Sequence, residues 1–449
     1  MKFDIYLELY LSYLLNQNIM FYKHSFINLS FNPSPPSVMH IDLNSCFATV
    51  EQQANPCLRG KPVAVAAYTT PNGCVIAPSI EAKKLGIKVG MRVREAKALY
   101  TKLIVLSPDP DKYRFVNRKI LALLREYSCN LSVKSIDEIV LNFSGGRFFP
   151  QNMKEAAWEI KKRIRQEIGE WLTVSVGIAS NRYLAKVVSG LEKPDGLIVI
   201  DHSNFQNIYQ KMRVENLCGI KFRNMLRLHR VGIFTVRDMY RADIIRLKAA
   251  FMSITAYYWY LRLRGFEIDE VEFSRKSFGH SYAIYKATNN ITMLSRLLCK
   301  LVEKMGKRLR SAGYNAQGIH MSLEYSDHSF WHHGHTTTAK MYASQELYQQ
   351  ARKLMLSAGP LKPVRIMAVS CFKLAKNPLN QLYLLPEEEK KRALTSAIDT
   401  VNERFGVFTV FPATMMGSKD YIPDRIAFGG IRELEEFVFR EPINVENSS

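Results

Sequence analysis

Three carboxylates in two distant parts of the chain have the residue types needed for phosphoryl transfer. Asp42 lies in the run HIDLNSCFATVE, and Asp137 and Glu138 lie in the run VKSIDEIVLNF. Both runs alternate like strands, and each places a carboxylate where a buried strand would normally carry Val or Ile. An isolated buried carboxylate is costly, so a cation partner is expected. Oxygen ligands of this kind suit Mg²⁺, and two ions would form a two-metal phosphoryl-transfer site.

The elements that position these carboxylates predict an α+β chain with more than one domain. Apolar runs predict strands at 40–43, 62–68, 73–77, 103–106, 138–143, 173–179 and 197–200. Amphipathic stretches such as 152–168 separate them, and beyond residue 201 the pattern becomes helical. A helix at 290–312 and strands at 318–325 and 364–374 then follow. With 449 residues, the chain is long enough for several cores.

Asp-Glu pairs are common on solvated strand ends, so the run SIDE alone would not indicate chemistry. The joint pattern is more specific. The chain also contains GCVIAPSIEAKKLGIKVG at 73–90 and TVSVGIASNRYLAKVVSGLEKPDG at 173–196. In this order and spacing, the four motifs resemble the Y-family, or translesion, DNA polymerases. The resemblance covers about residues 39–430.

This resemblance implies a ferredoxin-like palm, small fingers, a helical thumb and an α/β little-finger domain that binds DNA. Mapped onto this chain, it gives an N-terminal extension outside the catalytic fold at 1–37, palm at 38–45 and 110–200, fingers at 46–109, thumb at 201–265, a linker at 266–276, little finger and C-terminal region at 277–432, and a tail at 433–449.

The same resemblance implies metal ligands. Asp42 and Asp137 would bridge two Mg²⁺ ions, and Glu138 would bind the ion nearer the primer end. The backbone carbonyl of Leu43 would complete the ion on the nucleotide side. These residues form the expected catalytic site.

Nucleotide-binding residues follow from the same motifs. Lys83 and Lys193 would bind the triphosphate, and Ser45, Cys46 and Phe47 would lie along the nucleotide. Phe47 occupies the steric-gate position, where a ring would collide with a 2′-hydroxyl and so favour deoxynucleotides. Without these motifs, the simpler interpretation would be that the two lysines are solvated surface residues and that Phe47 packs in a hydrophobic core.

Three positions depart from the commonest family pattern. Asn44 replaces a frequent Asp, Cys46 replaces an aromatic or apolar residue, and Ile80 stands where many members carry a Tyr. None removes a metal ligand, although losing the Tyr hydroxyl would weaken nucleotide binding. Asn44 and the 73–90 run resemble the SOS-response branch, which includes the polymerase V catalytic subunit, polymerase IV-like enzymes and phage relatives.

The charge balance predicts a polyanionic partner. The chain has 62 Lys plus Arg and 41 Asp plus Glu, which gives a formal net charge of +21. Nucleic acid is the usual partner of such a protein, although a basic surface or an anionic membrane would also fit. The family resemblance implies which partners these are: primer–template DNA and a deoxynucleoside triphosphate.

Cysteine usage predicts a reducing, cytoplasmic environment. The chain has seven Cys and no CxxC pair, so neither a disulfide framework nor a zinc site is expected. The apolar segment 1–22 contains Asp4 and Glu8 and makes a poor membrane span. We therefore expect no membrane association, and a monomer when the protein is not bound to partners.

Two further patterns are ambiguous. The run QLYLL at 381–385 resembles the clamp-binding peptide of the family, with Gln381, Leu384 and Leu385 as its contacts, but it would equally fit a strand. The histidines of the run HSFWHHGH at 328–335 could suggest a metal site. Without Cys or paired carboxylates, they are better interpreted as polar sheet residues near DNA.

The sequence therefore predicts a template-directed, Mg²⁺-dependent DNA polymerase for low-fidelity translesion synthesis. Two alternatives remain open: a palm-fold nucleotidyl cyclase, which would need no DNA, and a catalytically weak or inactive DNA-binding accessory protein derived from a polymerase. Ile80 and the altered glycine turn GIKF at 219–222, in the region that resembles the thumb, motivate the second alternative.

Overall fold

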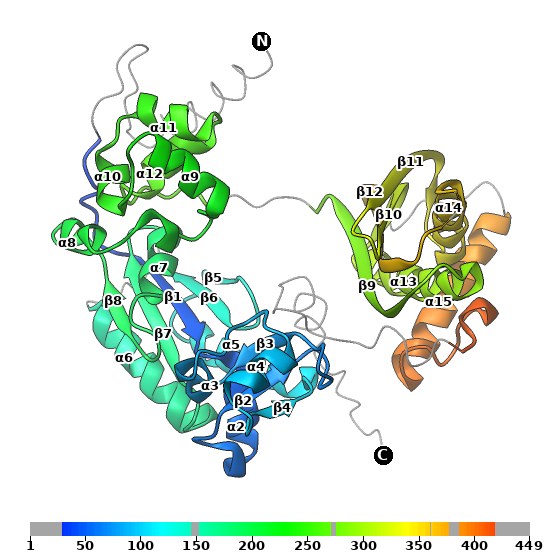
Figure 1. The fold of residues 1–449 in the computed structure, drawn as a ribbon, viewed down its shortest axis with the longest axis horizontal. Helices are drawn as coiled ribbons and strands as arrows, with labels where there is room; N and C mark the ends of the chain where they lie inside the picture. The colour runs from blue at the N-terminus through cyan, green and yellow to red at the C-terminus, as the bar shows by residue number, and fades with distance from the viewer. Residues whose placement is uncertain (1–28, 145–151, 271–274, 360, 377–385, 418–449) are drawn as a thin grey trace, which may run out of the picture. The chain divides into compact units, whose positions relative to one another are not determined.

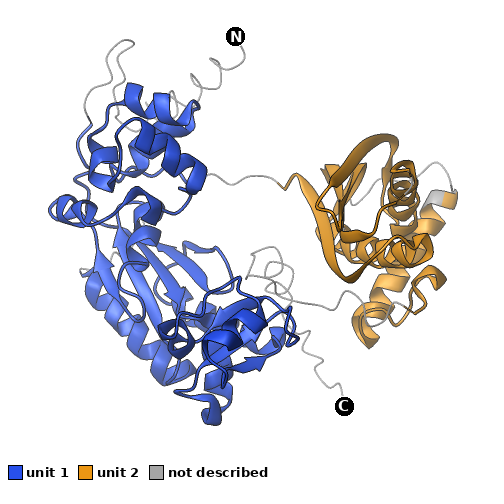
Figure 2. Cartoon of the chain, in the orientation of Figure 1, with its two compact units in different colours: residues 1–271, 426–434 blue, residues 272–425, 435–449 orange. Residues whose placement is uncertain are grey.

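The chain forms two compact units, shown in separate colours in Figure 2. The computed structural model describes residues 29–144, 152–270, 275–359, 361–376 and 386–417. Unit 1 contains the described residues up to 270, and unit 2 contains those from 275 to 417. Each unit has its own sheet and core, so each is described separately.

A five-stranded sheet forms the centre of unit 1 (Figure 1), in the order β5-β6-β1-β7-β8. The strands are β1 (Val38–Leu43), β5 (Leu131–Val133), β6 (Glu138–Asn142), β7 (Val174–Ala179) and β8 (Leu197–Val199). β7 and β8 run parallel, and the other neighbouring pairs run antiparallel. Because β1 is central, residues on β1 have neighbours from both β6 and β7.

Three helices accompany this sheet: α5 (Pro110–Arg125), α6 (Met153–Arg163, continued by a π-helical turn at Ile164–Ile168) and α7 (Arg182–Ser189). Asn181 caps α7 by accepting a hydrogen bond from the backbone N–H of Leu184 at 2.7 Å. A Cβ on Gly177 of β7 would lie 2.0 Å from the carbonyl oxygen of Ala185. Glycine therefore lets α7 pack directly on the sheet.

A smaller α/β region follows β1. It contains α2 (Cys46–Ala54), a 3₁₀ turn (Pro56–Leu58) and a sheet of order β3-β2-β4, with α3 (Ile80–Lys84) and α4 (Val93–Leu99). The strands of that sheet are β2 (Val63–Ala66), β3 (Val75–Pro78) and β4 (Ile104–Leu106). The chain returns through α5, whose residue Tyr113 packs against α2.

The last part of unit 1 is helical. It comprises α8 (Phe205–Gln210), a 3₁₀ turn (Val214–Asn216), α9 (Phe222–Arg230), α10 (Val236–Arg241), α11 (Ile244–Phe251) and α12 (Thr255–Arg262). Their apolar residues share one core with α7. This packing joins the helical region to the central sheet.

The fold of unit 1 begins earlier than the sequence suggested. Phe31 is only 5% exposed and stacks on Phe205, with ring centroids 4.3 Å apart. The buried guanidinium of Arg264 donates to the carbonyl of Leu29, and Asn32 donates its backbone N–H to the carbonyl of Arg264. The expectation that all of 1–37 lies outside the fold is therefore wrong for 29–32, while 1–28 lie outside the described residues.

Unit 2 is a four-stranded antiparallel sheet in the order β11-β10-β12-β9. Its strands are β9 (Ser277–Thr288), β10 (Tyr314–Tyr325), β11 (Phe330–Met341) and β12 (Val364–Lys376). The helices α13 (Ile291–Ser311) and α14 (Ser344–Ser357) pack in its core, and α15 (Pro386–Phe405) and a 3₁₀ turn (Ala413–Met415) follow. A paired Arg310 and Asp399 join α15 to α13.

The predicted α+β multidomain class is confirmed, but one local prediction needs correction. The run 133–143 is not a single strand, because β5 ends at Val133 and β6 begins at Glu138. Asp137 therefore lies in the bend just before β6 rather than within a strand. The apolar pattern also did not predict the long strands β9 and β11.

Candidate catalytic site

Asp42 and Glu138 lie directly opposite each other on neighbouring strands. The antiparallel register of β1 and β6 pairs Asp42 with Glu138 and His40 with Val140. Opposed residues share a face of a sheet, so the two carboxylates project from the same side. Like charges in this position repel each other, which means that this edge of the sheet requires nearby positive charge.

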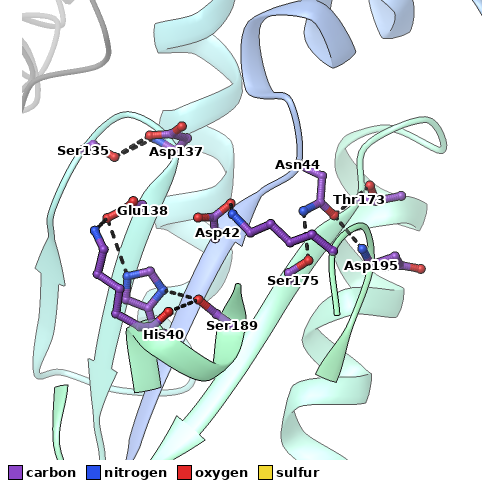
Figure 3. A network of polar contacts seen from close by, with 12 residues as sticks. His40, Asp42, Asn44, Ser135, Asp137, Glu138, Thr173, Ser175, Ser189 and Asp195 are labelled. Atoms are coloured by element: carbon purple, nitrogen blue, oxygen red, sulfur yellow. Dashed lines mark hydrogen bonds and ion pairs between the residues drawn. The ribbon is translucent and has the colours of Figure 1, made fainter. Parts of the chain in front are cut away.

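The third carboxylate joins them from the bend before β6. The backbone N–H of Leu43 donates to the carbonyl of Asp137 at 2.9 Å, which ties the bend to the end of β1. The side chain of Asp137 accepts a hydrogen bond from Ser135. Burial raises the pKa of Asp137, and the charges of Asp42 and Glu138 raise it further. The predicted acidic residues therefore converge, as Figure 3 shows.

Two lysines supply the positive charge. The Nζ atom of Lys193 lies 2.6 Å from an oxygen of Asp42, and Lys186 on α7 pairs with Glu138. His40 Nε2 lies 3.6 Å from the same Glu138 oxygen. Burial acts to raise the pKa of Glu138, but His40 and Lys186 outweigh it and lower the pKa to about 2. Both paired carboxylates thus face cationic groups.

The donor set fits hard divalent cations. Among the described residues, no group of three or more His, Cys, Asp and Glu side chains is already arranged to hold a metal ion. However, Asp42, Asp137 and Glu138 offer carboxylate oxygens where β1 ends and β6 begins, and Leu43 follows Asp42 as the last residue of β1. Mg²⁺ prefers a few carboxylates together with substrate phosphates and water, so the residues suit it.

The predicted phosphate-binding groups gather beside Asp42. Burial lowers the pKa of Lys83 on α3, and the charge of Lys193 lowers it further, while Asp42 and Asp137 act in the opposite direction. Ser45 begins α2 with φ of 50°, and its buried Oγ atom has no hydrogen-bond partner among the described residues. The N-terminus of a helix is suited to an anion, so the start of α2 could help to bind a phosphate.

Phe47 is buried on α2 and held by an aromatic stack. Its ring lies 4.4 Å from that of Tyr113, at an interplanar angle of 13°. The Tyr113 hydroxyl donates to Glu51 at 2.9 Å, and Lys112 pairs with the same carboxylate. Cys46 is also buried, which raises the pKa of its thiol, and the charges of Asp137 and Asp42 add to this effect. These contacts hold in place the ring of Phe47, the residue that the sequence predicts as the steric gate.

Sequence reasoning missed His40, Lys186 and Tyr113. A signal existed for His40, which lies two residues before Asp42 and therefore on the same face of β1. Lys186 and Tyr113 had no local signal, because helix packing brings them to their partners from other segments. Ser135 could have been noticed, since it precedes Asp137 by two residues.

The remaining predictions fall elsewhere. The clamp-binding prediction for Gln381, Leu384 and Leu385 lies outside the described residues. His332 on β11 faces His320 on β10, with ring nitrogens 3.4 Å apart, whereas His333 and His335 lie on the other face of that sheet.

All seven cysteines are free. In the part of the chain that the structure describes, no helix combines the length and apolarity of a membrane span.

Family models match both halves of the chain. The impB/mucB/samB family model matches residues 41–190, which contain all three carboxylates. The model of the C-terminal domain of the same family matches residues 275–384, which include all four strands of the unit 2 sheet.

Known proteins of high similarity agree with these matches. DNA polymerase IV of Pelotomaculum thermopropionicum is 32% identical over 398 residues, covering 86% of this chain and 97% of the relative. DNA polymerase IV of Moorella thermoacetica is 31% identical over 379 residues, covering 82% of this chain and 94% of the relative.

Solved structures show the same relationship. A Dbh-based Y-family DNA polymerase chimera matches with a TM-score of 0.66 and 26% identity, covering 76% of this chain and 99% of the chimera. These relatives do not favour a cyclase or a non-catalytic accessory protein. The chain therefore belongs to the impB/mucB/samB family of Y-family DNA polymerases and is a DNA-directed DNA polymerase.

Proposed function

We propose that this chain adds deoxynucleotides to a primer 3′ end by two-metal phosphoryl transfer at Asp42, Asp137 and Glu138. The observation that carries the proposal is the convergence of these three carboxylates at one edge of the central sheet, with Lys193 and Lys83 beside them. Carboxylates for cations and ammonium groups for phosphates are the two parts that nucleotidyl transfer needs.

The carboxylates would hold two Mg²⁺ ions. Asp42 and Asp137 would be shared ligands, Glu138 would serve the primer side, and the carbonyl of Leu43 would serve the nucleotide side. When bound, such ions activate the attacking 3′-hydroxyl and stabilise charge on the leaving pyrophosphate. Lys186 pairs with Glu138 and limits the repulsion between Glu138 and its acidic neighbours.

The nucleotide would be held by Lys193, Lys83 and the start of α2 at Ser45 and Cys46. Lys193 pairs with Asp42, so its ammonium group lies where it could bind a phosphate of the nucleotide. Phe47 would lie under the sugar and reject a 2′-hydroxyl by contact. Because its ring is stacked on Tyr113, it could not easily move aside.

Low-fidelity synthesis on damaged templates is the activity that follows from family membership. The small α2–α4 region offers limited enclosure for the nascent base pair, so geometric selection would be weak. The net charge of +21 favours primer–template DNA as partner. We further propose a cytoplasmic monomer, with Gln381, Leu384 and Leu385 as the contacts to a sliding clamp.

Primer extension on an undamaged and an abasic template tests this function. Asp137→Ala combined with Glu138→Ala is expected to reduce incorporation at least about a thousandfold, because cation binding is lost. Asp111→Ala is the matched control, since that carboxylate is 95% exposed on α5, and it should retain full activity.

Unchanged incorporation by the double variant would contradict the site. Two other results would contradict the polymerase function itself. Release of cyclic nucleotide without primer and template would favour a cyclase, and salt-sensitive DNA binding without incorporation would favour an accessory protein.

A further inference from the structure

Asn44 is the residue at which the chain departs from the common acidic pattern, and its amide lies at a junction of three segments. It follows the last residue of β1 and is only 3% exposed. Its backbone N–H donates to the carbonyl of Thr173, just before β7, at 2.9 Å. Both polar atoms of its side chain also have partners, visible in Figure 3.

The orientation of the amide follows from chemistry. The backbone N–H of Asp195 lies 2.8 Å from the Oδ1 atom of Asn44, and a backbone N–H can only donate. The atom facing it must therefore be the amide oxygen, which also accepts from the Thr173 hydroxyl at 3.1 Å. The amide nitrogen then donates to the Ser175 hydroxyl at 2.9 Å. Every partner is consistent with a neutral amide in this one orientation.

Asp195 belongs to the same loop as Lys193. The opposite side of this loop is held by Lys161, which is 4% exposed and donates to the carbonyls of Asp195 and Gly196. The peptide of Asp195 is thus held at its N–H by Asn44 and at its carbonyl by Lys161. The side chain of Lys193 is 40% exposed and pairs with Asp42 at 2.6 Å.

We propose that Asn44 is a positioning residue that fixes the backbone of the Lys193 loop and thereby sets the reach of the Lys193 ammonium toward the nucleotide triphosphate. The inference rests on the proposed role of Lys193 in nucleotide binding. Asn44 itself does not touch the nucleotide.

Two substitutions separate this role from simple core packing. Asn44→Ala removes the acceptor, and we expect the nucleotide KM to rise roughly tenfold while kcat changes by less than about twofold. Asn44→Asp keeps an acceptor for Asp195, so its KM should stay within about threefold of the wild-type value. Thr173→Val is the matched control, because it removes only the second donor to the same oxygen and should leave KM unchanged.

A readout without turnover complements the kinetics. Titration of a deoxynucleoside triphosphate into the protein bound to a dideoxy-terminated primer and template measures Kd directly. Asn44→Ala should raise this Kd by the same factor as KM. In a Lys193→Met background, Asn44→Ala should cause no further increase, since the ammonium group that it positions is gone.

Several results would overturn the inference. These are an Asn44→Ala variant that lowers kcat with KM and Kd unchanged, an Asn44→Asp variant as impaired as Asn44→Ala, or independent effects of the Asn44 and Lys193 substitutions. The polymerase proposal is judged separately, by wild-type primer extension and by the effect of Lys193→Met alone. Thermal unfolding of each variant shows that the folded protein is being compared.

Discussion

The central sheet of unit 1 and the sheet of unit 2 each carry polar side chains on one face, and these two polar faces differ in charge. In unit 1, Asp42 and Glu138 stand opposite each other and are held by Lys193 and Lys186. In unit 2, two rows of cross-strand neighbours carry no Asp, Glu, Lys or Arg. The first row consists of His332, Ser322, Ala368 and Ser281, and the second of Gly334, His320, Ser370 and Gly279.

This difference separates two physical tasks. A phosphoryl-transfer site needs fixed charges, and fixed charges near a sheet need counter-charges to offset repulsion and burial. A surface that lies against a nucleic acid groove needs close approach, which small neutral side chains permit. Substitutions in unit 1 should therefore change chemistry and nucleotide selection, whereas substitutions on the unit 2 face should change DNA affinity alone.

The largest of the three effects in this comparison concerns sugar selection in unit 1. Phe47→Ala removes a buried ring that Tyr113 holds in place, so ribonucleotides should be admitted. We expect the ratio of ribonucleotide to deoxynucleotide kcat/KM to rise roughly a hundredfold. Single-nucleotide incorporation assays measure both values.

The control for this prediction is Phe115→Ala, which removes a 55% exposed ring from α5. It should leave the sugar ratio unaltered. If the ratio for Phe47→Ala also stayed constant, Phe47 would be a packing residue and nucleotide selection would reside elsewhere in unit 1.

A smaller effect concerns the stability that Glu138 gains from its pairing with Lys186. Its pKa is lowered to about 2 from an ordinary 4.5, so its ionised form stabilises the fold fully above about pH 4.5 and progressively less as the pH falls toward 2. Lys186→Met should raise this pKa and cost about 1 kcal/mol of unfolding free energy at pH 7. The cost should shrink as the pH falls below 4.5.

Urea unfolding of wild type and variant at pH 7, 4 and 3 measures this pH dependence. Lys162→Met is the matched control, because Lys162 is exposed on α6. A loss for Lys186→Met that is equal at all three pH values would mean that Lys186 contributes packing rather than charge, and the contrast between the two sheets would weaken.

The smallest effect concerns the two uncharged rows on the sheet of unit 2. Burial lowers the pKa of His320, and the charges of His332 and His333 lower it further. His320 therefore gains its proton only at pH values below the ordinary histidine pKa of about 6.5. Protonation adds positive charge, so DNA affinity should rise about twofold between pH 7.5 and pH 6.

Fluorescence anisotropy with labelled primer–template DNA at constant salt measures this change. His320→Gln combined with His332→Gln should make the affinity independent of pH over that range while kcat stays at the wild-type value. A pH response that survives in this variant would place the titrating group outside the two rows. A loss of kcat would show that the two sheets do not divide their tasks as proposed.

The sequence by itself determined the chemistry that this protein can perform. The residue types of Asp42, Asp137 and Glu138, their place in alternating apolar runs and the order of the four motifs were sufficient to predict an α+β polymerase. These features are local, because strand periodicity and motif spacing depend on residues near each other along the chain.

Only the tertiary structure decided which groups pair with these carboxylates and which distant segments pack together. Lys186, on a helix, pairs with Glu138 on the sheet. Asn44 accepts a hydrogen bond from Asp195, 151 residues further along the chain. Phe31 packs in a hydrophobic core although it belongs to the segment that was expected to lie outside the fold. Such contacts join segments through packing and hydrogen bonds across sheet register. No periodicity along the chain encodes them, so the folded sheet was required to show them.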